Sequence, residues 1–216
     1  AGIKKLKEAF KKKIDVHSLT ASQVLNVPID EVTNDQRRNA KTINFGIIYG
    51  LSAFGLSKQI GISRKFAKEY IDSYFEQYPG IKEYMERMKD FLDKNGYVET
   101  LFGRRINLKE YQSKNPMIRN YAFRQAINAP IQGTAADIIK RAMIKYYNLR
   151  ENKIFKNTRL LLQVHDELVF EVGKENLNEI INEITKIMEN AYLPPIDLGV
   201  AISVSVGCGK NWEEAH

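Results

Sequence analysis

Residues 33–50 read TNDQRRNAKTINFGIIYG, and the interpretation of the whole chain rests on this stretch. Thr33 followed three residues later by Gln36 forms a capping box, which predicts that a helix begins there. Gly50 suits the left-handed backbone position that ends a helix. Between these two ends, four side chains recur every four residues and therefore share one helix face: Arg37, Lys41, Phe45 and Tyr49.

The shared face presents two cations, then an aromatic ring, then a phenol. A nucleoside triphosphate needs the same groups in the same order, cations for its phosphates and rings for its sugar and base. Arg37 can hold phosphate oxygens bidentately, and Lys41 can act as a point charge or as a proton donor when pyrophosphate leaves. Spacing alone leaves a second interpretation open, an ordinary amphipathic helix whose cations are solvated.

The pattern RRxxKxxxFGxxYG, from Arg37 to Gly50, resembles motif B of the family A DNA polymerases. In that family this helix belongs to the fingers subdomain and closes over the incoming deoxynucleotide. The resemblance implies that Arg37 and Lys41 bind the triphosphate, with Lys41 also catalytic. It further implies that Phe45 lies against the sugar and that Tyr49 lies beside the templating base.

Residues 160–172, LLLQVHDELVFEV, form two apolar runs around three polar residues. The runs are typical of buried strands, with His165, Asp166 and Glu167 at their tight junction. Such a junction is often only a solvated hairpin tip. Beside the first pattern, however, it resembles motif C of the same family, where Asp166 and Glu167 are catalytic and bind Mg²⁺ and His165 lies close to the primer end.

Further positions are expected to bind phosphate or primer–template DNA by the same resemblance. His17 is expected to reach a phosphate of the nucleotide. Donors along the minor groove check the shape of a base pair without reading its sequence. The residues expected to contact DNA are Ser52 and Phe54 on the template strand, and Arg124, Asn128, Gln132, Gln163 and His165 along the groove. For the helix that carries 124–132, a solvated polar edge is the alternative.

Two-metal phosphoryl transfer needs carboxylates that hold two ions about 3.5–4 Å apart. The family takes one essential aspartate from motif A and one from motif C, and the 216 residues contain no motif A sequence. We therefore expect the Mg²⁺ site to be completed by a carboxylate from another segment or from a second polypeptide that carries motif A and the thumb. We also expect the chain alone to be inactive.

The predicted fold class is α+β, with helical fingers over residues 1–96 and the C-terminal part of an antiparallel palm over residues 97–216, lacking the thumb and the motif A strand. The expected elements are helices at about 2–13, 15–26, 33–50, 53–60, 63–78, 81–95, 116–149 (bent near Pro130) and 174–192, hairpins at 97–108 and 160–172, and a last strand from Val200 to Val206.

Composition limits the class of protein further. The 33 basic and 26 acidic residues give a net charge of +7, which suits a polyanionic partner, although lysine-rich helices are also common as solvated surfaces. Cys208 is the single cysteine, so no internal disulfide can form. No apolar run approaches the roughly 18 residues of a membrane span. We expect a cytoplasmic, nucleoid-associated protein of bacterial or phage-like type, with no membrane contact.

Together these features predict template-directed DNA synthesis from deoxynucleoside triphosphates on primer–template DNA. A single-subunit, phage-type RNA polymerase fragment is one alternative, since it shares the lysine-to-tyrosine helix and an aspartate hairpin. Glu167 after Asp166, and Phe45 four residues after Lys41, favour the DNA enzyme. A non-catalytic chain that binds only primer–template or nucleotide is the other alternative.

Overall fold

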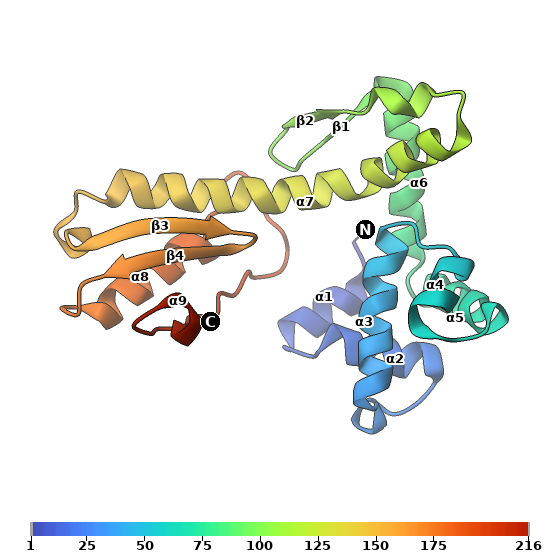
Figure 1. The fold of residues 1–216 in the computed structure, drawn as a ribbon, viewed down its shortest axis with the longest axis horizontal. Helices are drawn as coiled ribbons and strands as arrows, with labels where there is room; N and C mark the ends of the chain where they lie inside the picture. The colour runs from blue at the N-terminus through green and yellow to red at the C-terminus, as the bar shows by residue number, and fades with distance from the viewer. Residues whose placement is uncertain (1, 216) are drawn as a thin grey trace. The chain divides into compact units, whose positions relative to one another are not determined.

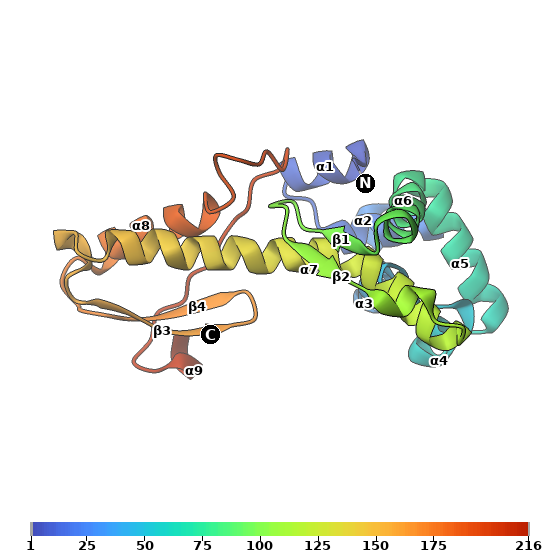
Figure 2. The same ribbon diagram turned by 90° about the horizontal axis from the view of Figure 1, so that it is seen from above.

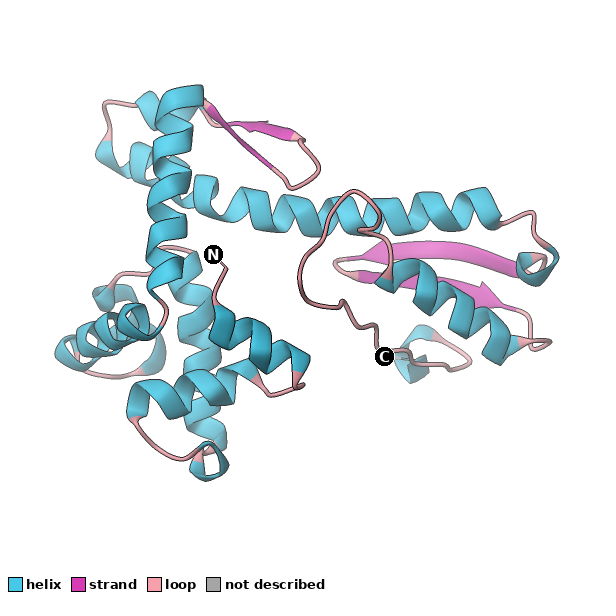
Figure 3. Ribbon diagram, turned by 180° about the vertical axis from the view of Figure 1, so that it is seen from behind, coloured by secondary structure: helices cyan, strands magenta, loops and turns pink. Residues whose placement is uncertain are grey.

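The computed structural model describes residues 2–215. Within them the chain forms two compact units, one up to Ile131 and one from Gln132 onward, so the division falls inside helix α7. Helices dominate, and each of the two sheets is a two-stranded antiparallel hairpin (Figures 1 and 3). The α+β fold class is thereby confirmed. The predicted fingers–palm boundary after residue 96 is a functional division, and it stays a prediction.

Most elements occur where the sequence predicts them. In chain order they are α1 (Lys4–Lys11), α2 (Val16–Leu25), η1 (Ile29–Glu31), α3 (Asn34–Ile48), α4 (Ala53–Ile60), α5 (Arg64–Gln77), α6 (Pro79–Asn95), β1 (Tyr97–Glu99), β2 (Arg105–Asn107), η2 (Lys109–Gln112), α7 (Pro116–Leu149), η3 (Lys153–Phe155), β3 (Thr158–Val164), β4 (Glu167–Val172), α8 (Leu177–Glu189) and α9 (Trp212–Ala215). None of the described helices is long and apolar enough to cross a membrane.

The ends of α3 have the predicted chemistry. The Gln36 amide donates to the Thr33 hydroxyl at 3.2 Å, and the Thr33 amide donates to the Gln36 side chain at 2.8 Å, so the capping box is formed. After the last turn, Gly50 takes a left-handed φ of 71°. Gly61 ends α4 in the same way. A glycine adopts this conformation without the steric cost that a Cβ imposes.

The core of the first unit forms against the inner face of α3. Ile43 and Ile47 are buried there and pack with Leu56 of α4 and with a row of tyrosines that continues from α5, Tyr70, Tyr74 and Tyr78. Residues two positions apart on a helix lie about 200° apart around its axis. Burial of 43 and 47 therefore turns positions 41, 45 and 49 toward solvent.

A smaller cluster joins α6, the β1–β2 hairpin and the first half of α7. Leu92, Val98 and Ala126 are fully buried in it. The Tyr84 hydroxyl of α6 donates to the Ile127 carbonyl of α7 at 2.8 Å. Both strands of the hairpin are shorter than predicted, three residues each, and Val98 pairs with Ile106.

The second unit packs helices against one face of the β3–β4 hairpin (Figure 2). Leu160 and Phe170 pair across the two strands and contact the buried residues of α7 and α8. The buried Tyr146 hydroxyl of α7 donates to the Thr158 carbonyl at 2.7 Å, which ties the helix to the start of β3. The hairpin predicted from the two apolar runs is confirmed.

Two helix starts differ from the prediction for local reasons. α6 begins at Pro79, two residues before the expected Ile81, because proline is well suited to the first position of a helix. α8 spans Leu177–Glu189 and is shorter at both ends than the expected 174–192. Asn176 takes a left-handed φ of 61° directly before it, so helical geometry cannot extend back to residue 174. The bend expected near Pro130 stays a prediction.

The predicted strand from Val200 to Val206 is wrong, because the structure assigns no strand there. The alternation that suggested it is present: Val200, Ile202 and Val204 are half-buried, whereas the residues between them are exposed. A strand, however, requires a neighbouring strand to pair its backbone groups. Among residues 2–215 the segment has no such neighbour, since β3 and β4 pair only with each other.

Candidate nucleotide and metal sites

The predicted nucleotide-binding face of α3 is solvent-exposed along its whole length. Arg37, Lys41, Phe45 and Tyr49 are all exposed, and the two aromatic residues keep 49% and 48% of their surface accessible. Core packing among the described residues does not use these two rings, so they are accessible to a partner. The structure thus brings all four residues onto one accessible face, as their spacing predicts.

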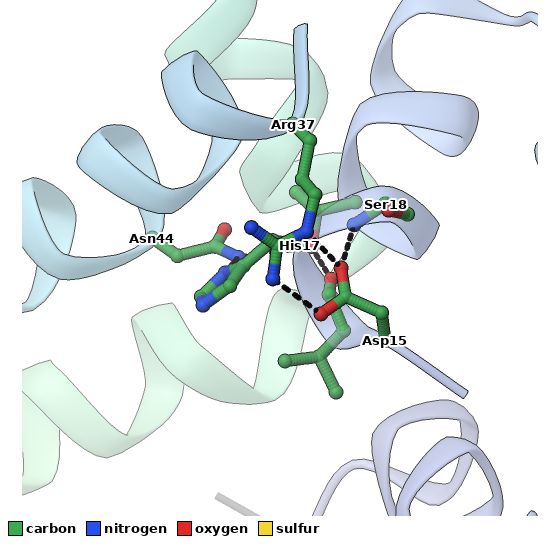
Figure 4. A network of polar contacts seen from close by, with 7 residues as sticks. Asp15, His17, Ser18, Arg37 and Asn44 are labelled. Atoms are coloured by element: carbon green, nitrogen blue, oxygen red, sulfur yellow. Dashed lines mark hydrogen bonds and ion pairs between the residues drawn. The ribbon is translucent and has the colours of Figure 1, made fainter. Parts of the chain in front are cut away.

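Arg37 is held by an aspartate from the start of α2. Its Nε donates to Asp15 Oδ1 at 3.0 Å and its Nη2 donates to Asp15 Oδ2 at 2.8 Å, a bidentate pair (Figure 4). The same carboxylate caps α2, because Asp15 Oδ1 accepts from the Ser18 amide at 2.7 Å. The hydrogen bond from Arg37 holds the pKa of Asp15 well below its usual range, and Asp15 in turn raises the pKa of Arg37.

A short network of hydrogen bonds holds His17, which lies two residues after Asp15. The Thr20 hydroxyl donates to the Val16 carbonyl at 2.7 Å, so its oxygen accepts from Asn44 Nδ2 at 3.2 Å. The same Nδ2 lies 3.0 Å from His17 Nδ1. Because Nδ2 is a donor, His17 Nδ1 accepts, and the neutral ring carries its proton on Nε2.

The surroundings of His17 favour this neutral form. Burial lowers the pKa of His17, the nearby Arg37 and Lys41 lower it further, and Asp15 opposes them. Its ring lies 5.9 Å from the Phe45 ring, centroid to centroid. The structure therefore gathers His17, Arg37 and Phe45 at one place, whereas Asn44 Oδ1 is buried with no hydrogen-bond partner among the described residues.

The C-terminal end of α3 contacts one of the predicted DNA-binding residues. A Cβ added at Gly50 would lie 2.7 Å from both Cγ and Cδ of Arg124, so the arginine side chain passes directly over the glycine. The Arg124 guanidinium lies 5.8 Å from the Tyr121 ring centroid. The absence of a Cβ at Gly50 thus permits both the left-handed backbone and the close approach of the Arg124 side chain.

The two predicted template contacts lie at the start of α4. Ser52 is the N-cap residue, and its hydroxyl accepts from the Gly55 amide at 3.2 Å. Phe54 is 53% exposed, with Lys58 Nζ 4.6 Å from its ring centroid. Ser52 therefore has a structural role beside the predicted one, and Phe54 offers an exposed ring to a partner.

The predicted groove residues of α7 differ in exposure. Gln132 is exposed and Arg124 is half-buried. Asn128, however, is only 6% exposed, so it does not belong to a solvated polar edge. A four-residue spacing aligned these side chains on the helix but could not show which of them the first unit covers.

The predicted metal ligands lie at the tip of the β3–β4 hairpin. His165 and Asp166 form the two-residue turn, and His165 takes a left-handed φ of 51°, as such tight hairpin turns require. Glu167 is the first residue of β4 and pairs with Val164, so it belongs to the strand and not to the turn. Gln163 Nε2 donates to the His165 carbonyl at 2.7 Å and braces the turn.

Asp166 is exposed and Glu167 is half-buried at this tip. Carboxylate oxygens are the ligands that Mg²⁺ prefers. Among residues 2–215, however, no three His, Cys, Asp or Glu side chains gather closely enough to hold a metal ion. The assignment of Asp166 and Glu167 as metal ligands thus stays a prediction.

The sequence alone missed the polar residues that hold the predicted ones. The sequence predicted only that a helix begins at about residue 15, and Asn44 and Thr20 carried no pattern. Asp15 and Arg37 are 22 residues apart, and His17 and Asn44 are 27 apart. These contacts exist because α2 packs against α3.

Comparison with known proteins agrees with the two motifs. Residues 1–214 match the sequence model of the family described as DNA polymerase family A. DNA polymerase I of Rhizobium leguminosarum is 49% identical over 217 residues, which cover 100% of this chain and 21% of that protein. DNA polymerase I of Pseudomonas aeruginosa is 51% identical over 212 residues, which cover 98% of this chain and 23% of that protein.

A solved structure is similar over nearly the same range. It is described as the POL domain of Pol1 from M. smegmatis in complex with DNA primer-template and dNTP, and it has a TM-score of 0.90 and 44% identity over 97% of this chain and 36% of that one. The chain spans about a fifth to a quarter of the length of the two curated relatives. Since the family match covers nearly all of its residues, the chain belongs to DNA polymerase family A.

Proposed function

We propose that the chain is the fingers and C-terminal palm portion of a DNA-directed DNA polymerase, which transfers a nucleotidyl group from a deoxynucleoside triphosphate to a primer 3′-hydroxyl. The exposed face of α3 carries this proposal. Its two cations and two rings are accessible at once. The similar M. smegmatis polymerase domain was solved in complex with DNA primer-template and dNTP, the two ligands that this proposal requires.

On this face the triphosphate lies along the first two turns of α3. Arg37 and Lys41 bind its oxygens, and Lys41 donates a proton or stabilises charge as pyrophosphate leaves. Phe45 contacts the sugar, and Tyr49 lies beside the templating base. His17 contributes a hydrogen bond from Nε2, the nitrogen that carries its proton when Nδ1 accepts from Asn44.

Primer–template DNA contacts residues of α4, of α7 and of the β3–β4 hairpin. Ser52 and Phe54 contact the template strand. Arg124, Gln132, Gln163 and His165 face the minor groove, where acceptors lie in similar places for every correct base pair. Asn128, which the sequence places on the same track, is buried and is left out of this contact. We place this reaction on the chromosomal DNA of a bacterial cytoplasm.

Asp166 and Glu167 would hold Mg²⁺, which would supply activation of the 3′-hydroxyl and neutralisation of charge on the leaving group. Two carboxylates on one hairpin supply only part of the oxygen coordination that Mg²⁺ requires. We propose that the remaining ligand is a motif A aspartate from a segment outside these 216 residues, or from a second polypeptide that carries motif A and the thumb.

Primer extension with Mg²⁺ tests this function. We expect no extension by the chain alone, extension when a polypeptide that carries thumb and motif A is added, and none when the same pair contains Asp166→Asn. Asp197→Asn in the exposed segment after α8 is the matched control and keeps full activity. Extension by the pair with Asp166→Asn at the wild-type rate would contradict the assignment of the metal site.

A further inference from the structure

The guanidinium of Arg37 is held by a carboxylate of the same unit. Both nitrogens on one edge, Nε and Nη2, donate to the two oxygens of Asp15 at 3.0 and 2.8 Å. A phosphate is recognised through the same two-pronged edge of an arginine. Arg37 therefore cannot present this edge to a phosphate while Asp15 holds it.

Asp15 is well placed to compete for Arg37. Its own position is fixed by the hydrogen bond from the Ser18 amide, so little freedom is lost when it binds Arg37. The pair is also within reach of a ligand, because the two side chains keep 44% and 41% of their surface accessible. A carboxylate at this position both occupies Arg37 and repels an approaching polyanion.

Neighbouring cations on α3 are not held in this way. Lys41, one turn further along, has no ion pair among the described residues. Arg38 pairs with Asp35 of its own helix, through one contact and at about 75% exposure of both side chains. Of the two cations on the proposed triphosphate-binding face, Arg37 is thus the one that a carboxylate from outside α3 holds through two hydrogen bonds.

We propose that Asp15 is a positioning residue that competes with the triphosphate for Arg37 and thereby sets the nucleotide affinity of the site. This proposal rests on the proposed function of α3. Binding of a triphosphate then exchanges one bidentate partner of Arg37 for another, and Asp15 keeps its cap on α2. His17, which is proposed to contact a phosphate, lies two residues after Asp15. The released Asp15 carboxylate therefore stays close to the phosphates and repels them.

The test compares Asp15→Asn with Asp35→Asn by calorimetric titration of the 216-residue chain with inorganic triphosphate and with a deoxynucleoside triphosphate. Both variants lose one negative charge next to an arginine of α3. Asparagine caps a helix as well as aspartate does, so α2 keeps its start. We expect Asp15→Asn to tighten binding about three- to tenfold, and Asp35→Asn to change it less than twofold.

Two further variants separate this inference from the function on which it rests. With Arg37→Ala, the gain from Asp15→Asn should become smaller, because only the repulsion between Asp15 and the polyanion is then relieved, and Asp15→Glu should bind like the wild type. The ¹⁵N signal of Arg37 Nε should move on addition of triphosphate and should move in the same direction in Asp15→Asn without ligand. A structural role for Asp15 alone would not produce these effects.

The outcomes are distinct. If Arg37→Ala weakens binding tenfold or more but Asp15→Asn binds like the wild type or more weakly, the triphosphate site stands and competition by Asp15 is wrong. If neither Arg37→Ala nor Lys41→Ala affects binding, the proposed function of α3 is wrong. Far-ultraviolet circular dichroism of each variant verifies its fold, and Asp15→Ser, which also keeps a cap, replaces any variant that unfolds.

Discussion

Gly50→Ala should destabilise the first unit more than the same change at Gly61. Both glycines have a φ of 71°, so alanine meets the same backbone penalty at each. A left-handed backbone costs an L-residue about 1–2 kcal/mol. Alanine also lowers the conformational entropy of the unfolded chain, which offsets about 0.4–1 kcal/mol of this cost. Gly61→Ala, whose Cβ would meet nothing within 4 Å, should therefore lose only about 1 kcal/mol of unfolding free energy.

The Gly50 variant carries an additional steric cost. Its new Cβ would lie 2.7 Å from Cγ and from Cδ of Arg124, atoms near the root of the side chain that cannot simply swing aside. Forcing extra atoms into such a contact typically costs about 1–3 kcal/mol. We therefore expect Gly50→Ala to lose about 2–4 kcal/mol in total.

Urea denaturation followed by circular dichroism measures these differences, with unchanged m-values as the condition for comparing them. Arg124→Ala removes the obstructing atoms, so Gly50→Ala should cost no more than Gly61→Ala in the Arg124→Ala background. Equal losses for the two glycine variants in the wild-type background would refute the contact between Arg124 and Gly50.

The remaining predictions concern the hydroxyl groups of two buried tyrosines and the half-buried His17. Tyr146→Phe should lower the unfolding free energy by about 0.5–1.5 kcal/mol, because it removes the hydrogen bond to a β3 carbonyl. Tyr70→Phe should be neutral or stabilising, because the buried Tyr70 hydroxyl has no hydrogen-bond partner among the described residues. Urea denaturation checks both. His17 has a pKa below the unfolded value of 6.5, so the folded chain binds fewer protons and the unfolding free energy should fall as the pH drops through 6.5. His17→Gln should remove this slope and His165→Gln should keep it; a slope that persists in His17→Gln would contradict its assignment to the burial of His17.

Local chemistry predicted much of the fold. The capping box at Thr33 and the left-handed glycine at 50 depend only on nearby residues, and each lies where the sequence places it. The segment 200–206 failed because a strand depends on a partner that its own alternation cannot supply. Local patterns therefore predicted the capped ends of α3, but they could not supply a pairing partner for residues 200–206.

The candidate site divides in the same way. A four-residue spacing sufficed to place Lys41 and Phe45 on one exposed face, because helix geometry fixes that relation. It could not predict the Asp15–Arg37 pair, which requires the packing of α2 against α3. Nor could it predict the burial of Asn128, whose environment is made by other elements.

The most direct test of the central proposal is the affinity of the chain for a deoxynucleoside triphosphate with Lys41→Ala, measured beside Lys65→Ala. Lys65 is the matched control, since it is an exposed lysine of the same unit whose only described ion pair is a long one, 3.9 Å to Glu69. Loss of a charge-assisted hydrogen bond to phosphate costs about 1.5–3 kcal/mol, which corresponds to a weakening of about 10- to 150-fold. We predict that loss for Lys41→Ala and less than a twofold change for Lys65→Ala. Equal effects of the two substitutions would contradict the assignment of the exposed face of α3 as the triphosphate site.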